Sequence, residues 1–170
     1  MLIDFSSKEI KSKIVYYGMP FSGKTTNLET IYRKKINNNN KNLIRLNNNE
    51  IVFFEYLTNY DIHRFKIKFE LFIAPGIIYC NSVLKIMLSR VDCIIFVVDS
   101  QKDKLKENIE SFENLKNNLS DLNIELKNIV FVVQFNKQDL ENLIDSKEIT
   151  ESDIFPQKTP VFYTSAIKEI

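Results

Sequence analysis

The sequence predicts a three-layer α/β fold in which a mostly parallel sheet lies between layers of helices. Two unbroken apolar runs rich in β-branched residues, Cys93–Val98 and Ile129–Val133, are typical of strands covered on both faces. Between them, apolar residues recur every three or four positions from Leu105 to Leu122, which predicts an amphipathic helix. From Phe65 to Ile73, apolar and charged residues alternate with the period of a strand. Strands that alternate with helices in this way form parallel sheets with right-handed crossovers.

Three further segments have the apolar character of strands. Ile14–Tyr17 is a short apolar run that reads as a buried strand, and Pro160–Thr164 is expected to be the last strand. Ile51–Leu57 is also strand-like, and only residues 58–64 separate it from Phe65–Ile73. These two strands should therefore form the one antiparallel hairpin of the sheet.

The helical and loop segments complete the expected order of elements. A helix is predicted from about Thr25 to Ile36, and Val83–Leu88 is helix-like. Asn37–Asn49 is polar and turn-favouring, so we expect a long loop there.

Composition narrows the class of protein. With 170 residues, the chain is long enough for a single domain, which we expect to span residues 1–170. Charged residues make up 26% of the chain but nearly cancel to a net charge of +1, which argues against nucleic acid or anionic membranes as partners. The apolar runs are too short to cross a bilayer, and Met1–Ile10 shows no export signal. We therefore expect a cytoplasmic protein.

Residues Gly18–Thr25 match the phosphate-loop pattern G-x-x-x-x-G-K-[ST] between a predicted strand and a predicted helix. Backbone N–H groups in such a loop turn inward to bind anions, and the positive end of the next helix points at the same site. The chain has only three glycines, and this loop contains two of them. Lys24 is expected to neutralise phosphate and transition-state charge, and the Thr25 hydroxyl to bind Mg²⁺. The expected phosphate-binding residues are Gly18, Phe21, Ser22, Gly23, Lys24, Thr25 and Thr26.

A second motif predicts that the base is guanine. Asn136-Lys137-Gln138-Asp139 directly follows a predicted strand and resembles the N-K-x-D motif of Ras-like GTPases. The Asp139 carboxylate can accept two N–H bonds from guanine, a pair that adenine does not offer, while Lys137 packs along the base and Asn136 ties this loop to the phosphate loop. Ser165-Ala166, after the last strand, resembles the third base-contacting segment. GTP and GDP are thus the expected ligands, with an ATP-using P-loop enzyme as the lesser alternative.

Taken together, these residues resemble one family, the MglA (mutual gliding-motility protein A) type of bacterial Ras-like small GTPase. The resemblance implies a polarity switch whose nucleotide state is read and reset by a roadblock-fold (MglB-like) partner. It also implies that the loops at 36–51 and 75–84 are ordered by the γ-phosphate, with Gly76 contacting the nucleotide. The residues that carry the resemblance are Lys13–Gly18, Ser22–Leu28, Phe53-Phe54, Phe65-Lys66, Ala74–Gly76, Val91-Asp92 and Phe96–Ser100.

The sequence departs from this family at positions that perform chemistry. Ile77 stands where the family has the glutamine that positions water, and Glu50-Ile51 stands where it has Arg-Thr, unless the alignment shifts in that variable loop. Ile73 offers no oxygen to a metal-bound water, and Pro20 removes one N–H donor from the phosphate loop. We therefore expect slow GTP hydrolysis, with a non-hydrolysing GTP-binding scaffold as the alternative.

A second departure concerns the last helix. The resemblance implies a final helix that covers one face of the sheet, but the chain reaches Ile170 soon after its last predicted strand. We therefore expect this helix to be missing or truncated, which would leave an exposed apolar strip.

Other conspicuous residues are given structural roles. His63 is placed in the hairpin turn, Cys80 and Cys93 are expected to pack rather than react, and Tyr79 to shield the phosphate site. Asp99 ends a predicted strand and either caps the next helix or binds metal.

Overall fold

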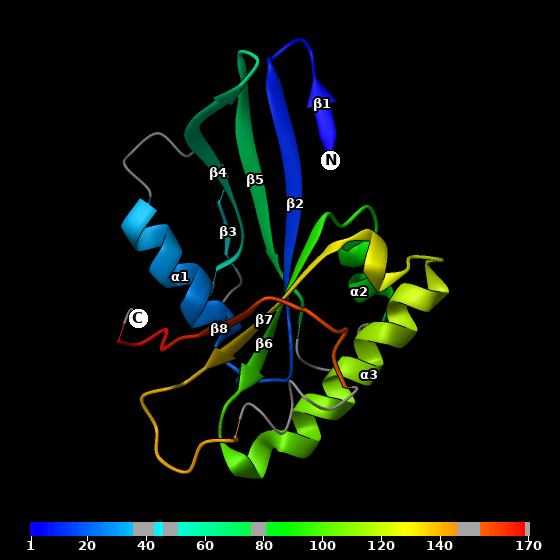
Figure 1. Ribbon diagram of the computed structural model, residues 1–170. Coiled ribbons are helices and arrows are strands. Elements are labelled where there is room, and N and C mark those ends of the chain that lie inside the picture. Colours follow the sequence, from blue (N-terminus) through cyan, green and yellow to red (C-terminus); the bar gives the residue numbers. More distant parts are fainter. Residues whose placement is uncertain (36–42, 46–50, 76–80, 146–153, 169–170) are drawn as a thin grey trace.

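The computed structural model describes residues 1–35, 43–45, 51–75, 81–145 and 154–168, and it contains an eight-stranded sheet (Figure 1). The strands follow the order β3-β4-β5-β2-β6-β7-β8, and β1 pairs with β2 beside this path. Their bounds are β1 Leu2–Asp4, β2 Glu9–Tyr17, β3 Leu43–Arg45, β4 Ile51–Ile62, β5 Phe65–Ile73, β6 Cys93–Asp99, β7 Val130–Asn136 and β8 Val161–Tyr163.

The central strands are parallel, as the apolar runs predict. β2 pairs in parallel with β5 and β6, and β7 pairs in parallel with β6 and β8. The predicted β4–β5 hairpin is present, but the expectation of only one antiparallel pair is wrong, because β1–β2 and β3–β4 are antiparallel as well. β3 also lies inside the segment expected to be a continuous loop, Asn37–Asn49, whose other residues lie outside the described part of the chain.

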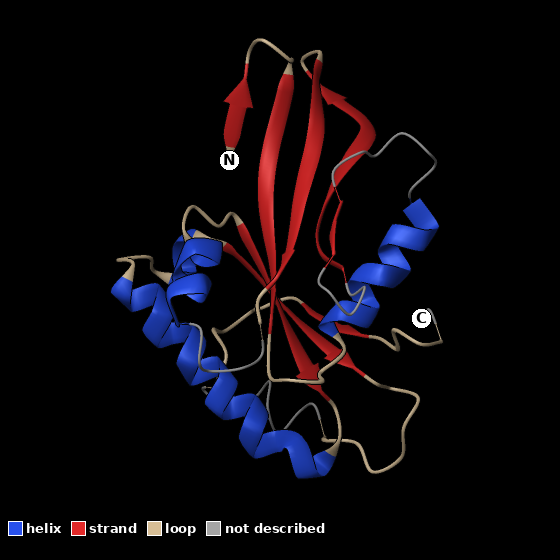
Figure 2. Ribbon diagram, turned by 180° about the vertical axis from the view of Figure 1, so that it is seen from behind, coloured by secondary structure: helices blue, strands red, loops and turns tan. Residues whose placement is uncertain are grey.

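The helices lie on both sides of the sheet, which gives the predicted three layers. Figures 1 and 2 show α1 on one side and α2 and α3 on the other. The helices are α1 Lys24–Lys35, α2 Asn81–Leu88 and α3 Leu105–Asp121, with 3₁₀ turns η2 Lys102–Lys104 and η3 Leu126–Asn128. Within the described residues 154–168 no helix follows β8.

Each layer of helices covers its own apolar core. On the α2 and α3 side, four phenylalanine rings pack together, with ring centroids 4.8–6.4 Å apart. These rings belong to Phe96, Phe112, Phe131 and Phe155. On the α1 side, Leu28 packs over a smaller cluster that includes Phe54 and Leu71.

One strand of the hairpin, β4, is longer than the sequence pattern predicts, whereas β5 has the predicted bounds. β4 continues to Ile62, so the connection predicted at residues 58–64 shortens to a tight turn at His63 and Arg64. Both turn residues have positive φ, 47° and 72°, as the mirror-image turns of hairpins require. His63 is exposed in this turn, as expected. None of the described helices is both long and apolar enough to cross a bilayer.

Candidate nucleotide-binding site

The predicted phosphate loop fills residues 18–23, between the end of β2 and the start of α1. Both of its glycines are required by the geometry. Gly18 has a φ of +146°, and a Cβ there would lie 2.3 Å from the Val97 carbonyl oxygen. Gly23 has a φ of +96°, and a Cβ there would lie 2.1 Å from Nδ2 of Asn136. No larger residue fits either position, so the backbone can follow this tight path only with glycine.

Lys24 is the first residue of α1, and its side chain folds back over the loop. Its ammonium donates hydrogen bonds to the carbonyl oxygens of Gly18 at 2.8 Å and Met19 at 2.7 Å. Burial lowers the pKa of Lys24 to about 8. A buried ammonium held by neutral carbonyls is a group that an anionic phosphate would stabilise, so the loop fits a bound phosphate.

The neighbouring loop residues complete this cradle. Ser22 is fully buried, and its Oγ has no hydrogen-bond partner within the described residues. Phe21 has a left-handed φ of 62° and is 91% exposed. Thr25 and Thr26 lie half-buried in the first turn of α1, where a hydroxyl is available to a phosphate-bound cation.

Asn136 joins the predicted base-binding motif to the phosphate loop. It ends β7, is 1% exposed, and its Nδ2 donates a hydrogen bond of 2.8 Å to the Ser22 carbonyl. Its Oδ1 accepts hydrogen bonds from the Ala166 N–H at 3.0 Å and the Thr164 hydroxyl at 3.3 Å. One buried amide therefore links three segments that are far apart in the sequence: residues 18–23, 136–139 and 164–166.

Lys137 and Asp99 form an ion pair beside this junction. Nζ of Lys137 lies 2.6 Å from Oδ2 of Asp99, which is 1% exposed. The second Asp99 oxygen accepts the Gln101 N–H at 3.2 Å. Both oxygens therefore have partners within the protein, which supports a role for Asp99 in the turn that leads to η2.

Asp139 and Ser165 lie in adjacent loops. A hydrogen bond from the Ser165 side chain is the main cause that lowers the pKa of Asp139, with smaller contributions that include Lys168 and Lys137. Asp139 is therefore a carboxylate at neutral pH and is only half-buried, so it remains an acceptor for a ligand. Ser165 and Ala166 are buried next to it, at 1% and 7% exposure.

Comparison with known proteins agrees with this geometry. The model of the ADP-ribosylation factor family matches residues 1–169. The chain is also 39% identical over 154 residues to mutual gliding-motility protein MglA of Myxococcus xanthus (strain DK1622), an alignment that covers 88% of this chain and 79% of that protein. The chain belongs to the MglA type of small GTPases. The predicted fold, the family resemblance and the small GTPase function are thereby confirmed, and guanine nucleotide is the ligand that this family binds.

Several predicted positions of this small GTPase lie outside the described residues. They are Gly76, Ile77, Tyr79, Cys80 and Glu50, and the side chain of Ile51 is likewise not described. Ile73 is described, and it is 6% exposed within the apolar cluster under α1. That position therefore offers a hydrocarbon and no metal ligand. Among the described residues, no group of three or more His, Cys, Asp or Glu side chains could hold a metal ion.

The site also contains residues that sequence reasoning missed. Asn27 and Gln134 are both 8% exposed, and Nε2 of Gln134 donates to Oδ1 of Asn27 at 2.7 Å and to Oγ1 of Thr164 at 2.9 Å. Thr30 of α1 donates to the Ala166 carbonyl at 3.1 Å. The sequence does contain one signal for this network, the single amide of Gln134 in the apolar run Phe131–Phe135. A buried polar side chain needs hydrogen-bond partners, so such an amide indicates a polar contact.

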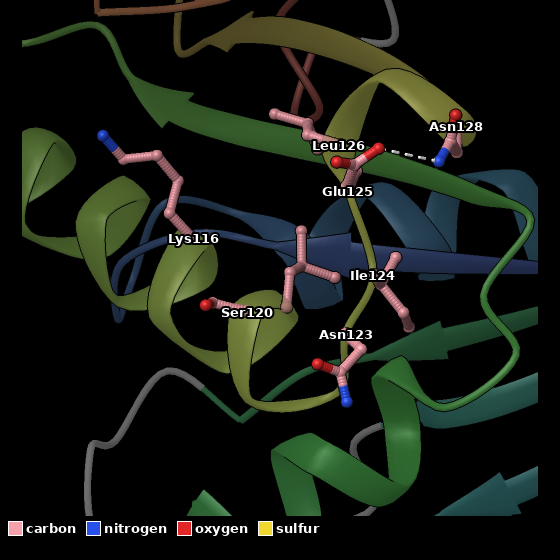
Figure 3. Close-up of a pocket in the computed structure, with 8 residues that line it drawn as sticks. Lys116, Ser120, Asn123, Ile124, Glu125, Leu126 and Asn128 are labelled. Carbon is pink, nitrogen blue, oxygen red and sulfur yellow. Dashed lines mark hydrogen bonds between the residues drawn. The ribbon is translucent and has the colours of Figure 1, made fainter.

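A surface pocket of about 630 Å³ lies away from this site, between the end of α3 and η3 (Figure 3). The pocket borders the N-terminal end of β7, whereas the nucleotide-binding loops follow the C-terminal ends of the strands, at the opposite edge of the sheet. Its two charged residues have partners, since Lys116 pairs with Glu113 at 2.6 Å and Glu125 with Lys127 at 3.0 Å. Burial raises the pKa of the free thiol of Cys93 to about 11, which agrees with a packing role.

Proposed function

We propose that this small GTPase acts as a cytoplasmic polarity switch, with residues 1–170 working as one domain that alternates between GTP and GDP. The observation that carries the proposal is the 2.8 Å hydrogen bond from Asn136 to the Ser22 carbonyl, because it holds the base-binding loop against the phosphate loop. The relative in Myxococcus xanthus is a mutual gliding-motility protein, which supports a role in polarity or motility. A roadblock-fold (MglB-like) regulator is the partner that we expect.

Each site residue has a proposed role in holding the nucleotide. The backbone of Gly18, Phe21, Ser22, Gly23 and Thr26 surrounds the phosphates, Lys24 neutralises their charge, and Gly76 approaches the γ-phosphate. Asn136, Lys137, Asp139, Ser165 and Ala166 form the guanine side. The Thr25 hydroxyl is the protein ligand that we propose for Mg²⁺, with the nucleotide phosphates supplying most other oxygens. Bound Mg²⁺ would offset phosphate charge.

We propose that hydrolysis is slow. The buried Ile73 presents only hydrocarbon, and Ile77 occupies the sequence position of the glutamine that orients water. The test is to incubate the purified protein with GTP and Mg²⁺ and to measure phosphate release. Conversion to GDP over hours supports a slow switch, and conversion at the rate of an ordinary unassisted GTPase contradicts slow hydrolysis. If GTP stays intact, the non-hydrolysing scaffold is the better description.

The base preference has its own test, which exchanges donor and acceptor at one position. Asp139→Asn replaces a carboxylate oxygen by an NH₂ group, which can donate to the 2-oxo group of xanthine but not to the 2-amino group of guanine. We expect the variant to lose GDP affinity and to gain affinity for xanthosine diphosphate. Asp103→Asn, which changes an exposed carboxylate outside the site, is the matched control and should bind as the unmodified protein does. Equal binding of adenosine and guanosine diphosphates by the unmodified protein would contradict the proposed function.

A further inference from the structure

Gln134 is a buried amide in the middle of an apolar strand, and its two N–H groups are both used. They donate to Asn27 on α1 at 2.7 Å and to Thr164 after β8 at 2.9 Å. Burying a side-chain amide is unfavourable unless its polar atoms are paired. The side chain therefore holds one defined orientation between α1 and the loop that follows β8.

Two chains of hydrogen bonds run from Gln134 to the phosphate loop. In the first, Nδ2 of Asn27 donates to the Gly23 carbonyl at 2.9 Å, beside the Asn27 backbone N–H, which donates to the same oxygen at 2.9 Å. In the second, the Thr164 hydroxyl donates to Asn136 at 3.3 Å, and Asn136 donates to the Ser22 carbonyl at 2.8 Å. Because carbonyl oxygens can only accept, the end points fix which way each amide faces, and Gln134 must be the donor to both chains.

The two chains end on consecutive carbonyls, and this arrangement has a consequence for the phosphate cradle. In a trans peptide the C=O and the next N–H point in opposite directions. Holding the Ser22 carbonyl therefore orients the Gly23 N–H, and holding the Gly23 carbonyl orients the Lys24 N–H. In a phosphate loop these two N–H groups are among those that must face the anion.

We propose that Gln134 is a positioning residue that couples recognition of the base to the grip on the phosphates. It touches neither ligand group itself and acts through Asn27 on one side and through Thr164 and Asn136 on the other. The inference rests on the proposed nucleotide-binding function. The inference adds a coupling within the site: a nucleotide that orders the base loop also orders the backbone amides around its phosphates.

The test compares Gln134→Met with a matched loss of a buried amide elsewhere. Met keeps the length of the side chain but removes both donors. Asn118→Leu makes the same kind of change at a 3% exposed amide of α3, whose partners are Asn114 and the hydroxyl of Tyr17 on the opposite face of the sheet. In the full chain loaded with fluorescent GDP, we expect Gln134→Met to accelerate GDP dissociation roughly ten- to hundredfold. Asn118→Leu should dissociate within about twofold of the unmodified protein.

A second readout separates coupling from a local defect. Affinity is measured for GDP, for GMP and for inosine diphosphate, so that the β-phosphate and the guanine 2-amino group are each removed once. We expect the ratio of GDP affinity to GMP affinity, and the ratio of GDP affinity to inosine diphosphate affinity, both to be smaller in Gln134→Met. The reason is that the base loop and the phosphate loop no longer stabilise each other in this variant. A folded variant in which GDP dissociates within about twofold of the unmodified rate overturns the proposal, as does equal acceleration by Asn118→Leu.

Thr164→Val keeps the inference testable if Gln134→Met fails to fold. This nearly isosteric change breaks only the chain through Asn136 and should accelerate dissociation by a smaller factor. An unchanged rate in Thr164→Val would then overturn the coupling. If the unmodified protein binds no guanine nucleotide, the proposed function fails first, and that result is distinct from binding that is insensitive to Gln134.

Discussion

The two faces of the sheet differ in how they are held together. On the face toward α2 and α3, the larger apolar cluster packs around the ring of Phe112, which is 1% exposed. On the face toward α1, the apolar cluster around Leu28 gives way to a buried polar network that includes Asn27 and Gln134. The first face mainly stabilises the fold, whereas part of the interior of the second face holds the ligand-binding loops in place.

The faces also differ in how far their helices extend. α2 and α3 lie along one face, while α1 is the described helix on the other (Figures 1 and 2). Beyond α1, residues on its face such as Ile14, Phe69 and Ile95 are only half-buried. Val130, which lies on the same face by strand register, is 61% exposed. Apolar side chains beyond α1 are therefore less covered than those under α2 and α3.

Phe112→Ala should produce the largest effect on stability. The ring contacts three other aromatic rings, with centroids 4.8–5.7 Å away, and its removal leaves a cavity in a rigid cluster. We expect the free energy of unfolding to fall by about 3–5 kcal/mol, measured by urea denaturation. Glu113→Ala, the exposed neighbour in an ion pair with Lys116, should cost less than about 1 kcal/mol. A loss below about 1 kcal/mol for Phe112→Ala would show that this face is not the stabilising one.

The α1 face contains a buried charged group, Lys24, whose protonation should make stability depend on pH. Burial lowers the pKa of Lys24 to about 8, from an ordinary value of 10.5. Between these values the unfolded chain holds the Lys24 proton more often than the folded protein does, so the contribution of Lys24 to the free energy of unfolding should rise as pH increases from about 8 to 10.5. The gain should be on the order of 1–3 kcal/mol, and none is expected below about pH 8, where both states are protonated.

Denaturation of the nucleotide-free protein across this pH range measures the effect, and Lys24→Met isolates it from other titrating groups. The free energy of unfolding of the unmodified protein minus that of Lys24→Met should rise with pH above about pH 8 and stay constant below it. Curves that remain parallel up to pH 10 would mean that the ammonium is not desolvated in solution.

The sequence predicted the parts of the molecule whose signal is local. Cys93–Asp99 and Val130–Asn136 are strands because a continuous apolar run fits only a covered position, and the phosphate loop depends on two glycines that tolerate no Cβ. β1 and β3 were missed because each has three residues, too few for a period, and both depend on a neighbouring strand for their pairing.

The site residues that the sequence did not predict are paired with residues far away along the chain. Gln134 is visible as one amide in an apolar run, but its partner Asn27 is 107 positions away, and only the fold brings them together. The ion pair of Lys137 with Asp99 likewise spans 38 positions. Motif spacing could therefore identify the residues proposed to touch the nucleotide, but it could not identify the residues that hold them in place.

The smallest effect that we predict compares two valines on opposite faces of one strand. Val133→Ala removes methyl groups from a fully buried position among the aromatic rings and should cost about 2 kcal/mol. Val130→Ala, three residues earlier on the α1 face, should cost less than about 1 kcal/mol, because Val130 is already 61% exposed. Urea denaturation at low protein concentration measures both values. Equal costs would mean that the strip beyond α1 is covered in solution, and a cost for Val130→Ala that increases with protein concentration would identify a second copy as the cover.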